Sequence, residues 1–364
     1  MRIPNTPIIV DEFRSSPGAY IYLLSHMHSD HTAGLTPSWN NGTIYCTRVT
    51  RSLLLQKFGL IDPSLVIALD EDEHHTIFLD PPTNKVSMQL VLIDANHCPG
   101  ACMFLMQGYF GTILHTGDFR FDPLMLDHPV LRPFCGGVAG LVNTNRGDSG
   151  GGGGGDNMDD DDDNDNGHGG DDDHSGGDAD EQRRQRQQQQ QQKVLDVLYL
   201  DDTFLDPDYE FPTRQVAGNQ VLQILEPYAP QQQQQQQSNT TNATTGGLQQ
   251  QQQQQQQSAP SLSAFNREMA RFVIGMDTLG KEELLIAIAL KLKSLVVVDE
   301  ERFNNLNTIR SAYDESSVTG DGRTVVPHVF THDERLGRVI VVKKKELYAK
   351  MRELRSKFPV VGII

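Results

Sequence analysis

The stretch Ser25-His26-Met27-His28-Ser29-Asp30-His31-Thr32-Ala33-Gly34 places three histidines and one aspartate within six residues. It follows the apolar run 19–24, which predicts a strand, so these polar side chains lie where a strand ends and where we expect a helix to begin. Because side chains two residues apart in an extended segment point the same way, His26 and His28 face one point. Asp30 and His31, in the next turn, face a second point. A solvated polar loop is the alternative interpretation.

Two later strand ends also present side chains that bind metals. The run 86–93 ends in Asp94-Ala95-Asn96-His97-Cys98-Pro99-Gly100, and the run 109–114 ends in His115-Thr116-Gly117-Asp118-Phe119-Arg120. Alone, His97 would be an ordinary core or surface histidine and Asp118 a turn residue. As further members of a set that opens with His-x-His-x-Asp-His, both are predicted to be metal ligands.

These residues predict a site for one or two cations. A first position would have the ligands His26, His28, His97 and Asp118, and a second would have Asp30, His31 and a shared Asp118. The ligand types suit zinc, with manganese or iron as relatives. Two metals about 3.5 to 4 Å apart can share a hydroxide and hold phosphate oxygens. Such a site catalyses hydrolysis, and thioesters, lactams, sulfates and phosphodiesters are all candidate substrates.

The first 135 residues predict a sheet of short strands. Runs rich in β-forming residues lie at 43–46, 66–69, 76–79 and 86–93, and a helix is predicted over 50–58 from the spacing of its apolar residues. The runs 102–106 and 109–114 predict a hairpin that turns at Gln107-Gly108.

From residue 194 onward, strand and helix patterns alternate. Strands are predicted at 194–200, 271–276, 294–298, 338–342 and 359–364, and helices at 213–225, 281–292, 301–312 and 344–357. Alternation of this kind predicts a parallel sheet covered by helices, so we expect an α/β fold for this half of the chain.

Two segments have a biased composition. Gly-, Asp- and Gln-rich tracts occupy about 140–192, and a poly-Gln segment with Asn and Thr occupies about 230–260. Neither has enough apolar side chains to offset the entropy of ordering, so both are predicted to be disordered insertions. Fourteen acidic residues and no basic ones lie between Asp148 and Glu181, which accounts for most of the net charge of −17. Because the rest of the chain is close to neutral, net charge does not decide the partner.

The chain as a whole has features of an intracellular soluble protein. Its four cysteines, Cys46, Cys98, Cys102 and Cys135, form no Cys-x-x-Cys pair and are too few for a disulfide scaffold. The first residues lack the apolar core of a signal peptide, and no apolar run approaches the roughly 18 residues of a membrane span. We therefore expect a cytoplasmic or nuclear protein with no membrane partner.

The ligand motifs resemble those of a known family. The His-x-His-x-Asp-His stretch, His97 and Thr116-Gly117-Asp118 resemble motifs two, three and four of the metallo-β-lactamase fold, and Asp11 matches the supporting aspartate of motif one. More narrowly, these stretches are similar to the DNA cross-link repair nucleases. Two further stretches, Leu198-Tyr199-Leu200-Asp201 and Ile274-Gly275-Met276-Asp277-Thr278-Leu279-Gly280-Lys281-Glu282, resemble parts of the β-CASP region that caps the metal site in these nucleases.

This resemblance implies an α/β fold with two domains. Residues 1–205 would form the N-terminal part of a metallo-β-lactamase αβ/βα sandwich that contains the first insertion, at about 140–192. Residues 206–364 would form a β-CASP cap region with the poly-Gln insertion at about 230–260. The closing strands of the sandwich would lie beyond Ile364, so we expect the sequence to be incomplete.

The resemblance also implies a nuclear, zinc-dependent 5′ to 3′ DNA exonuclease that acts in DNA repair, interstrand cross-link repair and telomere end processing. It would bind one or two Zn²⁺ ions, with Mn²⁺ or Mg²⁺ as alternatives, through the ligands named above. The residues implied as catalytic are Asp30, His31, Asp118 and Asp11, and those implied to contact substrate are Lys281 and Asp201. Its partners would be DNA with a phosphorylated 5′ end and a telomere protein bound through a tail that is not present here.

Three features depart from the family pattern. Asp277-Thr278 replaces a Tyr-Ser pair, which puts a negative charge where phosphate would approach. Ile340 occupies the place of a cap histidine. The motif of the Ser-Asp-His-Ser-Ser type, whose histidine completes the second metal position, would lie beyond Ile364.

Two other functions stay open. A hydrolase of the same fold that acts on RNA ends or small molecules would share the ligands but would not explain the Asn-His-Cys-Pro-Gly loop or the cap-like half. A truncated, non-catalytic protein that binds DNA ends is the alternative outside the enzymes. The basic stretch 343–357 is compatible with a DNA contact or with the solvated face of a helix.

Overall fold

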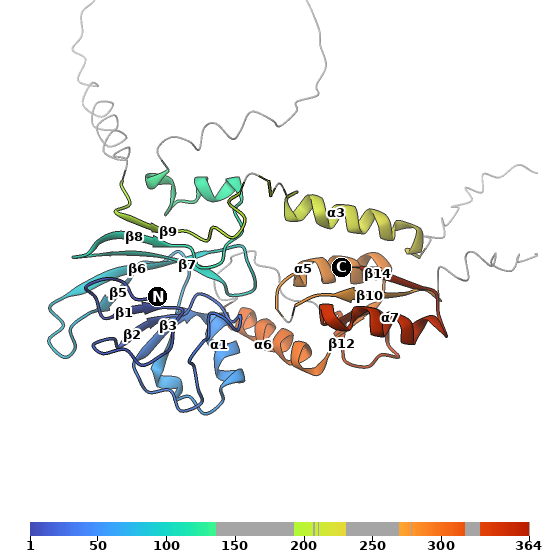
Figure 1. Cartoon of the computed structure of the whole chain (residues 1–364), viewed down its shortest axis with the longest axis horizontal. Coiled ribbons are helices and arrows are strands. Elements are labelled where there is room, and N and C mark those ends of the chain that lie inside the picture. The colour runs from blue at the N-terminus through green and yellow to red at the C-terminus, as the bar shows by residue number, and fades with distance from the viewer. Residues whose placement is uncertain are drawn as a thin grey trace, which may run out of the picture.

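The computed structural model describes residues 1–135, 193–206, 208–209, 211–230, 269–277, 279–316 and 328–363. The disordered insertions expected at about 140–192 and 230–260 lie almost wholly outside these ranges, as do Thr278 and Ile364. The described residues form an α/β fold with three sheets, which confirms the predicted class. Figure 1 shows two sheets in one half of the molecule and the third sheet, with its helices, in the other.

The first sheet is parallel throughout and has the order β1-β2-β3-β4. Its strands are β1 (Ile8–Val10), β2 (Ile21–Leu23), β3 (Thr43–Thr47) and β4 (Val66–Leu69). Helix α1 (Arg48–Lys57) begins where β3 ends, and the hydroxyl of Thr47 caps it by accepting a hydrogen bond from the amide of Thr50. The helix buries Leu53 and Leu54, which belong to the apolar pattern that predicted it, and also Val49, which precedes the predicted range 50–58.

The second sheet has the order β5-β6-β7-β8-β9. Its strands are β5 (His75–Phe78), β6 (Ser87–Asp94), β7 (Cys102–Gly108), β8 (Gly111–His115) and β9 (Val197–Tyr199). The first four pair antiparallel, and β9 joins β8 in parallel. The predicted turn at Gln107-Gly108 is wrong by two residues, because the pairing extends to Gly108 opposite Gly111 and the chain turns at 109–110.

These two sheets share a core. Side chains from one face of the first sheet, such as Ile8 and Leu23, join side chains from the second, such as Leu90 and Phe104, in one buried cluster. The amide of Cys102 also donates to a carbonyl just beyond β2, at a distance of 3.1 Å. Packing and hydrogen bonding therefore hold the strand ends of the two sheets together.

The third sheet is again parallel and has the order β12-β11-β13-β10-β14. Its strands are β10 (Arg271–Gly275), β11 (Leu295–Val297), β12 (Phe330–Thr331), β13 (Gly337–Val342) and β14 (Val360–Ile363). The helices around it are α3 (Arg214–Leu225), α5 (Glu282–Leu292), α6 (Glu300–Ser316) and α7 (Leu347–Arg355). The predicted alternation is confirmed from 271 onward, although the two-residue edge strand β12 was not predicted. The strand expected at 194–200 lies in the second sheet as β9, where it pairs with β8.

Short 3-10 helices connect several of these elements. They are Pro63–Leu65, Pro123–Asp127, Arg132–Phe134, Glu226–Tyr228 and Lys344–Glu346. The last of them forms the first turn of the helix that we predicted at 344–357. Within the described ranges, none of the helices has the length and apolar character needed to cross a membrane.

The two faces of the third sheet have different partners. Alternate residues of a strand point to opposite faces, and Val273 of β10 packs with Leu347 and Leu354 of α7. Phe272 and Ile274, its neighbours, belong to the large core that also contains α5 and α6. This larger core continues into the first half of the molecule.

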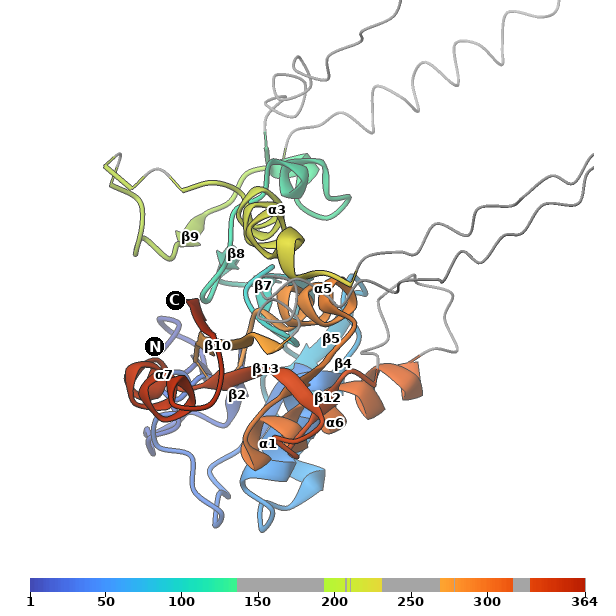
Figure 2. The same cartoon turned by 90° about the vertical axis from the view of Figure 1, so that its right-hand side faces the viewer.

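The junction between the halves is built from helices. Figure 2 shows α6 beside α1, and these two helices are in contact. The amide of Gln56 donates to Asn305 at 3.1 Å, and the hydroxyl of Thr308 donates back to the side-chain oxygen of Gln56. The third sheet is thereby attached to the first through α1.

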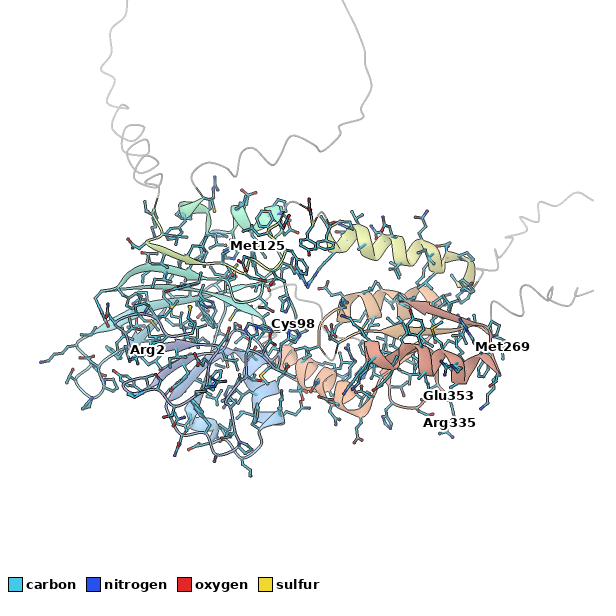
Figure 3. The ribbon with its side chains drawn as sticks, in the orientation of Figure 1. Arg2, Cys98, Met125, Met269, Arg335 and Glu353 are labelled. Atoms are coloured by element: carbon cyan, nitrogen blue, oxygen red, sulfur yellow. The ribbon has the colours of Figure 1, made fainter. Side chains whose placement is uncertain are left out.

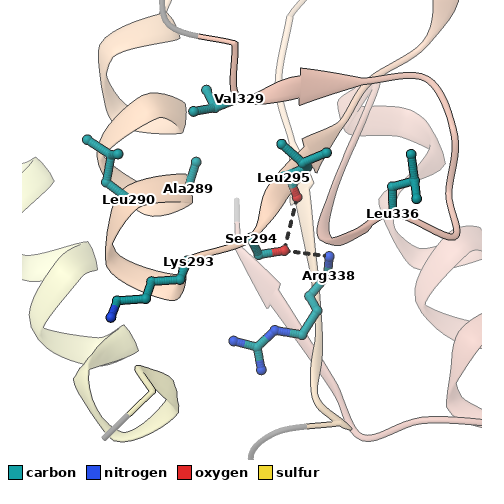
Figure 4. Close-up of a pocket in the computed structure, with 8 residues that line it drawn as sticks. All are labelled: Ala289, Leu290, Lys293, Ser294, Leu295, Val329, Leu336 and Arg338. Atoms are coloured by element: carbon teal, nitrogen blue, oxygen red, sulfur yellow. Dashed lines mark hydrogen bonds between the residues drawn. The ribbon is translucent and has the colours of Figure 1, made fainter. Parts of the chain in front are cut away.

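A hollow in the third-sheet half lies at the end of α5 (Figure 4). The hydroxyl of Ser294 donates to the carbonyl of Leu295 and accepts from the amide of Arg338. The guanidinium of Arg338 donates to the carbonyls of Tyr228 and Leu292. These contacts join the end of α5 to β13 and to the short helix that ends at Tyr228.

The stretch 29–34 forms turns and does not begin a helix, contrary to the expectation from sequence. The hydroxyl of Thr32 binds the carbonyls of His28 and Ser29, and the carbonyl of Ala33 accepts from the amide of Phe13. These bonds hold the segment against the loop after β1 and use carbonyls that a helix would need.

Gly34 is predicted to be essential for this turn. Its φ is +93°, and a Cβ there would lie 2.8 Å from the carbonyl carbon of Phe13. Gly34→Ala should therefore lower the free energy of unfolding by about 1 to 3 kcal/mol, measured by denaturant titration. Gly59→Ala is the control, because a Cβ at Gly59 would meet only the carbonyl oxygen of Leu55 at 3.7 Å. Equal stability of the two variants would contradict the prediction.

Candidate metal centre

Four strand ends bring the candidate ligands together. β1 and β2 run parallel, so Asp11 and the stretch that contains His26 leave neighbouring strands at the same edge. β6 and β8 both pair antiparallel with β7, so His97 and Asp118 also follow strand ends at one edge. The topology thus collects four separate segments at one place, as the sequence motifs predict.

The first group of possible ligands comprises His26, His28, His97 and Cys98, whose ligand atoms all lie within 4.8 Å of one another. His28 Nδ1 lies 3.0 Å from His26 Nε2 and 3.1 Å from His97 Nε2. The His28 ring meets each of the other two nearly at right angles. His26 and His28 therefore face one point, as their spacing predicts.

Two of these histidines are neutral at physiological pH. Burial lowers the pKa of His26 to about 2, and the neighbouring histidines lower it further. Burial and the neighbouring His28 lower the pKa of His97 to about 4. A neutral imidazole keeps one nitrogen lone pair, which is the form that binds a metal. Both histidines are therefore ready to act as ligands without losing a proton.

Asp11 and Ser25 orient the buried histidines. One oxygen of Asp11 accepts from the amide of Ser25 at 2.8 Å, and the other accepts from its hydroxyl at 2.7 Å and from His31 Nδ1 at 2.9 Å. Because the hydroxyl hydrogen of Ser25 is used on Asp11, His26 Nδ1 must donate to Ser25 Oγ, which lies 2.9 Å away. His26 Nε2 then carries the lone pair that faces the site.

The second group consists of His26, His31 and Asp118. One carboxylate oxygen of Asp118 lies 3.0 Å from His31 Nε2, and the other lies 3.8 Å from His26 Nε2 and 3.6 Å from His97 Nε2. Gly117, with φ of +54°, allows this close approach, since a Cβ there would lie 2.9 Å from Ser25 Cβ. One oxygen of Asp118 thus faces His31, and the other faces His26 and His97.

The charges of His31 and Asp118 depend on each other. Burial opposes the charge on His31, but hydrogen bonds to Asp11 and Asp118 outweigh it and raise the pKa of His31 to about 10. The hydrogen bond from His31, against the opposing effect of burial, lowers the pKa of Asp118 to about 2. His31 and Asp118 therefore form an ion pair in the absence of other ligands.

The residues present fit a bound cation. His26 Nε2 and His97 Nε2 both lie next to His28 Nδ1, which has at most one hydrogen to share between them. The nitrogens of His26, His28 and His97 crowd around one point, which leaves lone pairs unsatisfied unless an electron-poor group binds there. Imidazole, carboxylate and thiol are all metal ligands, so these groups can hold a metal ion.

Asp30 and Cys98 differ from the sequence-based assignment. Asp30 lies outside both groups; its side chain is 76% exposed, and its carboxylate is 3.7 Å from His31 Nε2. Cys98 was not predicted as a ligand, although its position next to His97 is a signal that could have indicated it. Burial raises the pKa of its thiol. In Figure 3, Cys98 lies at the junction of the two halves, whereas Arg335 and Glu353 lie far from it.

Lys281 lies at the start of α5, as its sequence position predicts. Its φ is +66°, and the carbonyl of the nearby Leu279 lies 3.4 Å from His28 Nε2. The amide of Gly280 donates to the carboxylate of Glu282, so this amide is already satisfied. The loop before α5 therefore contacts the first ligand group directly.

Glu282 fixes the position of this loop through buried contacts. Its carboxylate is buried and lies 3.5 Å from the guanidinium of Arg302 on α6. Burial raises the pKa of Glu282, an effect that the positive charge of Arg302 opposes. A buried, paired carboxylate of this kind is costly to disturb, so the loop is held in one position relative to His28.

Asp201 has a different environment. Its amide donates to the hydroxyl of Thr116, two residues before Asp118, at 3.0 Å. Its carboxylate accepts from the amide and the hydroxyl of Thr203. The structure therefore places Asp201 beside the Asp118 loop with its carboxylate engaged in a turn.

The fold and the site define an α/β protein with a centre of histidine, aspartate and cysteine side chains at its strand ends. No family model matches the chain. It is 31% identical over 349 residues to a Danio rerio protein named 5′ exonuclease Apollo, covering 95% of this chain and 41% of that protein. The Apollo of Rattus norvegicus is 28% identical over 364 residues, covering 99% of this chain and 46% of that protein.

Other relatives match a shorter segment. The DNA cross-link repair protein pso2/snm1 of Schizosaccharomyces pombe is 40% identical over 134 residues, covering 35% of this chain and 22% of that protein. The chain belongs to the family of Apollo and SNM1/pso2 proteins, which confirms the resemblance seen in the motifs. It spans less than half the length of these Apollo proteins. A solved structure of an Enterococcus faecalis protein overlaps with a TM-score of 0.40 at 12% sequence identity, covering 94% of this chain and 68% of that chain.

Removing the orienting carboxylate is predicted to weaken metal binding. Asp11→Asn keeps the shape but weakens the hydrogen bond that holds His31, so zinc affinity at pH 7 should fall by about 10- to 100-fold. Isothermal titration calorimetry measures this. His128→Ala is the control, because His128 pairs with Asp72 at 3.1 Å outside both ligand groups. Zinc affinity that is unchanged in the Asp11 variant would contradict the orienting role.

Proposed function

We propose that this chain carries the metal-dependent 5′ to 3′ exonuclease unit of a DNA repair protein, with phosphodiester bonds of DNA as its substrate. The observation that carries the proposal is the position of Asp118, which has one oxygen 3.0 Å from His31 Nε2 and the other 3.6 Å from His97 Nε2. A carboxylate in this position suits a centre with two cations. The names of the relatives, 5′ exonuclease and DNA cross-link repair protein, supply the substrate class.

The proposed architecture has two domains. The first two sheets, with residues 1–205, are the N-terminal part of a metallo-β-lactamase αβ/βα sandwich. The third sheet and its helices, within 206–364, are a β-CASP cap. The contact between the loop at Leu279 and His28 supports this division, because a cap over the site must reach the ligands.

The proposed metal is zinc, with one or two ions. The first would be held by His26, His28, His97 and Asp118, and the second by His31, Asp118 and Asp30. When bound, zinc provides a Lewis acid and lowers the pKa of water, which makes a nucleophile available near neutral pH. Cys98 is a further candidate ligand because it belongs to the first group.

The protein residues have distinct proposed roles. Asp11 holds His31 through Nδ1, and Ser25 holds His26, so both rings keep their orientation during turnover. Lys281 at the start of α5 binds a phosphate of the substrate. The negative charge of Asp277, which departs from the family pattern, is countered by Lys344 at 2.9 Å. Phosphate can therefore approach this rim with less repulsion than the sequence alone suggests.

Two further proposals concern the cellular setting. DNA as substrate implies that the protein works in the nucleus. A role in cross-link repair and at telomere ends, with a telomere-protein partner and a phosphorylated 5′ end as the preferred substrate, stays a prediction from the resemblance. Asp201 stays a predicted substrate contact as well, although Thr203 engages its carboxylate.

Loss of either proposed ligand carboxylate is predicted to stop cleavage. Asp118→Asn should reduce the release of 5′ nucleotides from single-stranded DNA by more than about 100-fold, because outer partners alone contribute up to that amount. Asp30→Ala should abolish cleavage with little effect on thermal stability, because its side chain is 76% exposed. Asp72→Asn, which changes a carboxylate paired with His128, is the control.

Other results would redirect the proposal. Full activity of the Asp30 variant would exclude Asp30 from the second position. Degradation of RNA without degradation of 5′-phosphorylated DNA would favour a hydrolase of RNA ends. Binding of DNA ends without cleavage, in protein that contains fewer than two metals per chain, would favour a non-catalytic role.

A further inference from the structure

Three exposed aromatic rings gather between β9 and α3. The exposed fractions of Phe204, Tyr209 and Phe211 are 45%, 54% and 62%. The ring centroid of Phe204 lies 5.6 Å from that of Tyr209 and 5.2 Å from that of Phe211. Tyr209 and Phe211 are close to parallel, with an angle of 14° and centroids 6.0 Å apart. These rings form what we call the aromatic cluster.

This cluster is unlike a core fragment. Rings that contribute to the core, such as Phe13 and Phe104, are almost fully buried, whereas these three contact one another and still face water. Contiguous exposed apolar surface of this kind marks interaction sites. The loop is shaped by backbone hydrogen bonds from the amide of Leu205 to Asp202 and from that of Tyr209 to Asp206. The rings are therefore presented by a turn-containing loop next to β9.

The aromatic cluster adjoins the metal centre. The guanidinium of Arg120 lies 5.4 Å from the ring centroid of Phe204. The amide of Arg120 donates to the carbonyl of Ala95, two residues before His97. Arg214, the first residue of α3, donates to Asn96 at 3.1 Å and to the carbonyl of His97. Figure 1 shows the segment that carries the cluster running from β9 toward α3 across the junction of the two halves.

Positive charge collects on the side of the cluster that faces the metal centre. Arg120 follows Asp118 by two residues and lies beside Phe204, and Arg214 donates to the carbonyl of His97. Lys281 precedes α5, which contacts α3. Neighbouring cations attract an anion, and the phosphates of a nucleic acid supply one.

Negative charge belongs to the same segment as the rings. Asp201 and Asp206 accept hydrogen bonds from amides within the loop, and Asp202 and Asp208 also lie there. Phosphates are repelled by carboxylates, whereas uncharged bases are not. A strand bound here would therefore direct its phosphates toward the arginines and its bases toward the rings.

We propose that Phe204, Tyr209 and Phe211 form a stacking surface for unpaired bases of a DNA strand whose phosphates lie along Arg120 and Arg214. The identity of the ligand rests on the proposed function. Stacking tolerates any base, because every base has a flat π-face, and arginine beside the ring adds to it. The surface would hold the single-stranded part of a substrate beside the metal centre, so single-stranded DNA should bind more tightly than blunt duplex.

Fluorescence anisotropy with the metal-loaded chain tests this surface. The probe is a labelled single-stranded oligonucleotide with phosphorothioate linkages, which resist cleavage, compared with a strand of equal length whose bases are replaced by abasic sites. Phe211→Ala should weaken binding of the normal strand on the order of 10-fold and that of the abasic strand little. Tyr348→Ala on α7, which removes another exposed ring, is the matched control and should have no effect.

Conservative variants separate stacking from folding. Phe211→Trp and Tyr209→Phe should keep the affinity of the normal strand, because both preserve an aromatic face. Equal binding of the normal and abasic strands by the unchanged protein would overturn the proposal, as would unchanged affinity of Phe211→Ala, which would favour a protein-docking role for the cluster. Because binding is measured without cleavage, a chain that binds bases but lacks nuclease activity would support the surface and contradict only the proposed reaction.

Discussion

The carboxylate of Asp11 is the contact on which the metal centre depends. It accepts three hydrogen bonds, two from Ser25 and one from His31, and so ties the end of β1 to the loop after β2. Through these bonds it decides which nitrogen of two histidines points away from the centre. His26 Nδ1 donates to Ser25, and His31 Nδ1 donates to Asp11, so the Nε2 atoms of both rings face the centre. One residue thereby sets the orientation of two rings, which is the usual role of an outer carboxylate.

Local sequence was sufficient for the parts of the centre that lie within one segment. Alternation along an extended chain predicted that His26 and His28 converge, and they do. The turn after them was not predictable, because it depends on the amide of Phe13, which reaches Ala33 from another loop. Cys98 was missed as a possible ligand because its position beside His97, although a signal, becomes decisive only when the fold places both residues near His26. Pairing between distant strands supplied what local pattern could not.

In the half of the molecule that contains the third sheet, some features again follow from local sequence and others only from contacts between distant residues. Periodicity predicted most of its strands and helices, but β12 has only two residues and leaves no periodic signal. The attachment of this half was not predictable from local sequence either, because the contacts of α1 with α6 and of His28 with Leu279 join residues about 250 positions apart. The loop before α5 is nevertheless specified by a buried contact between Glu282 and Arg302. The position of the loop near the ligands is therefore built into the core and does not depend on surface contacts.

Crowding of the histidines has a physical cost that the protein alone does not recover. His26 is fully buried, and burial has removed the charge from it and from His97, so neither ring gains a charged partner. His26 Nε2 and His97 Nε2 lie 3.0 and 3.1 Å from the same atom, His28 Nδ1, which has at most one hydrogen to share between them. Each unsatisfied buried group of this kind costs about 1 to 3 kcal/mol, and a cation between the lone pairs would convert that cost into binding energy. The folded chain is thus arranged so that binding a metal relieves a cost that is already present in the metal-free protein.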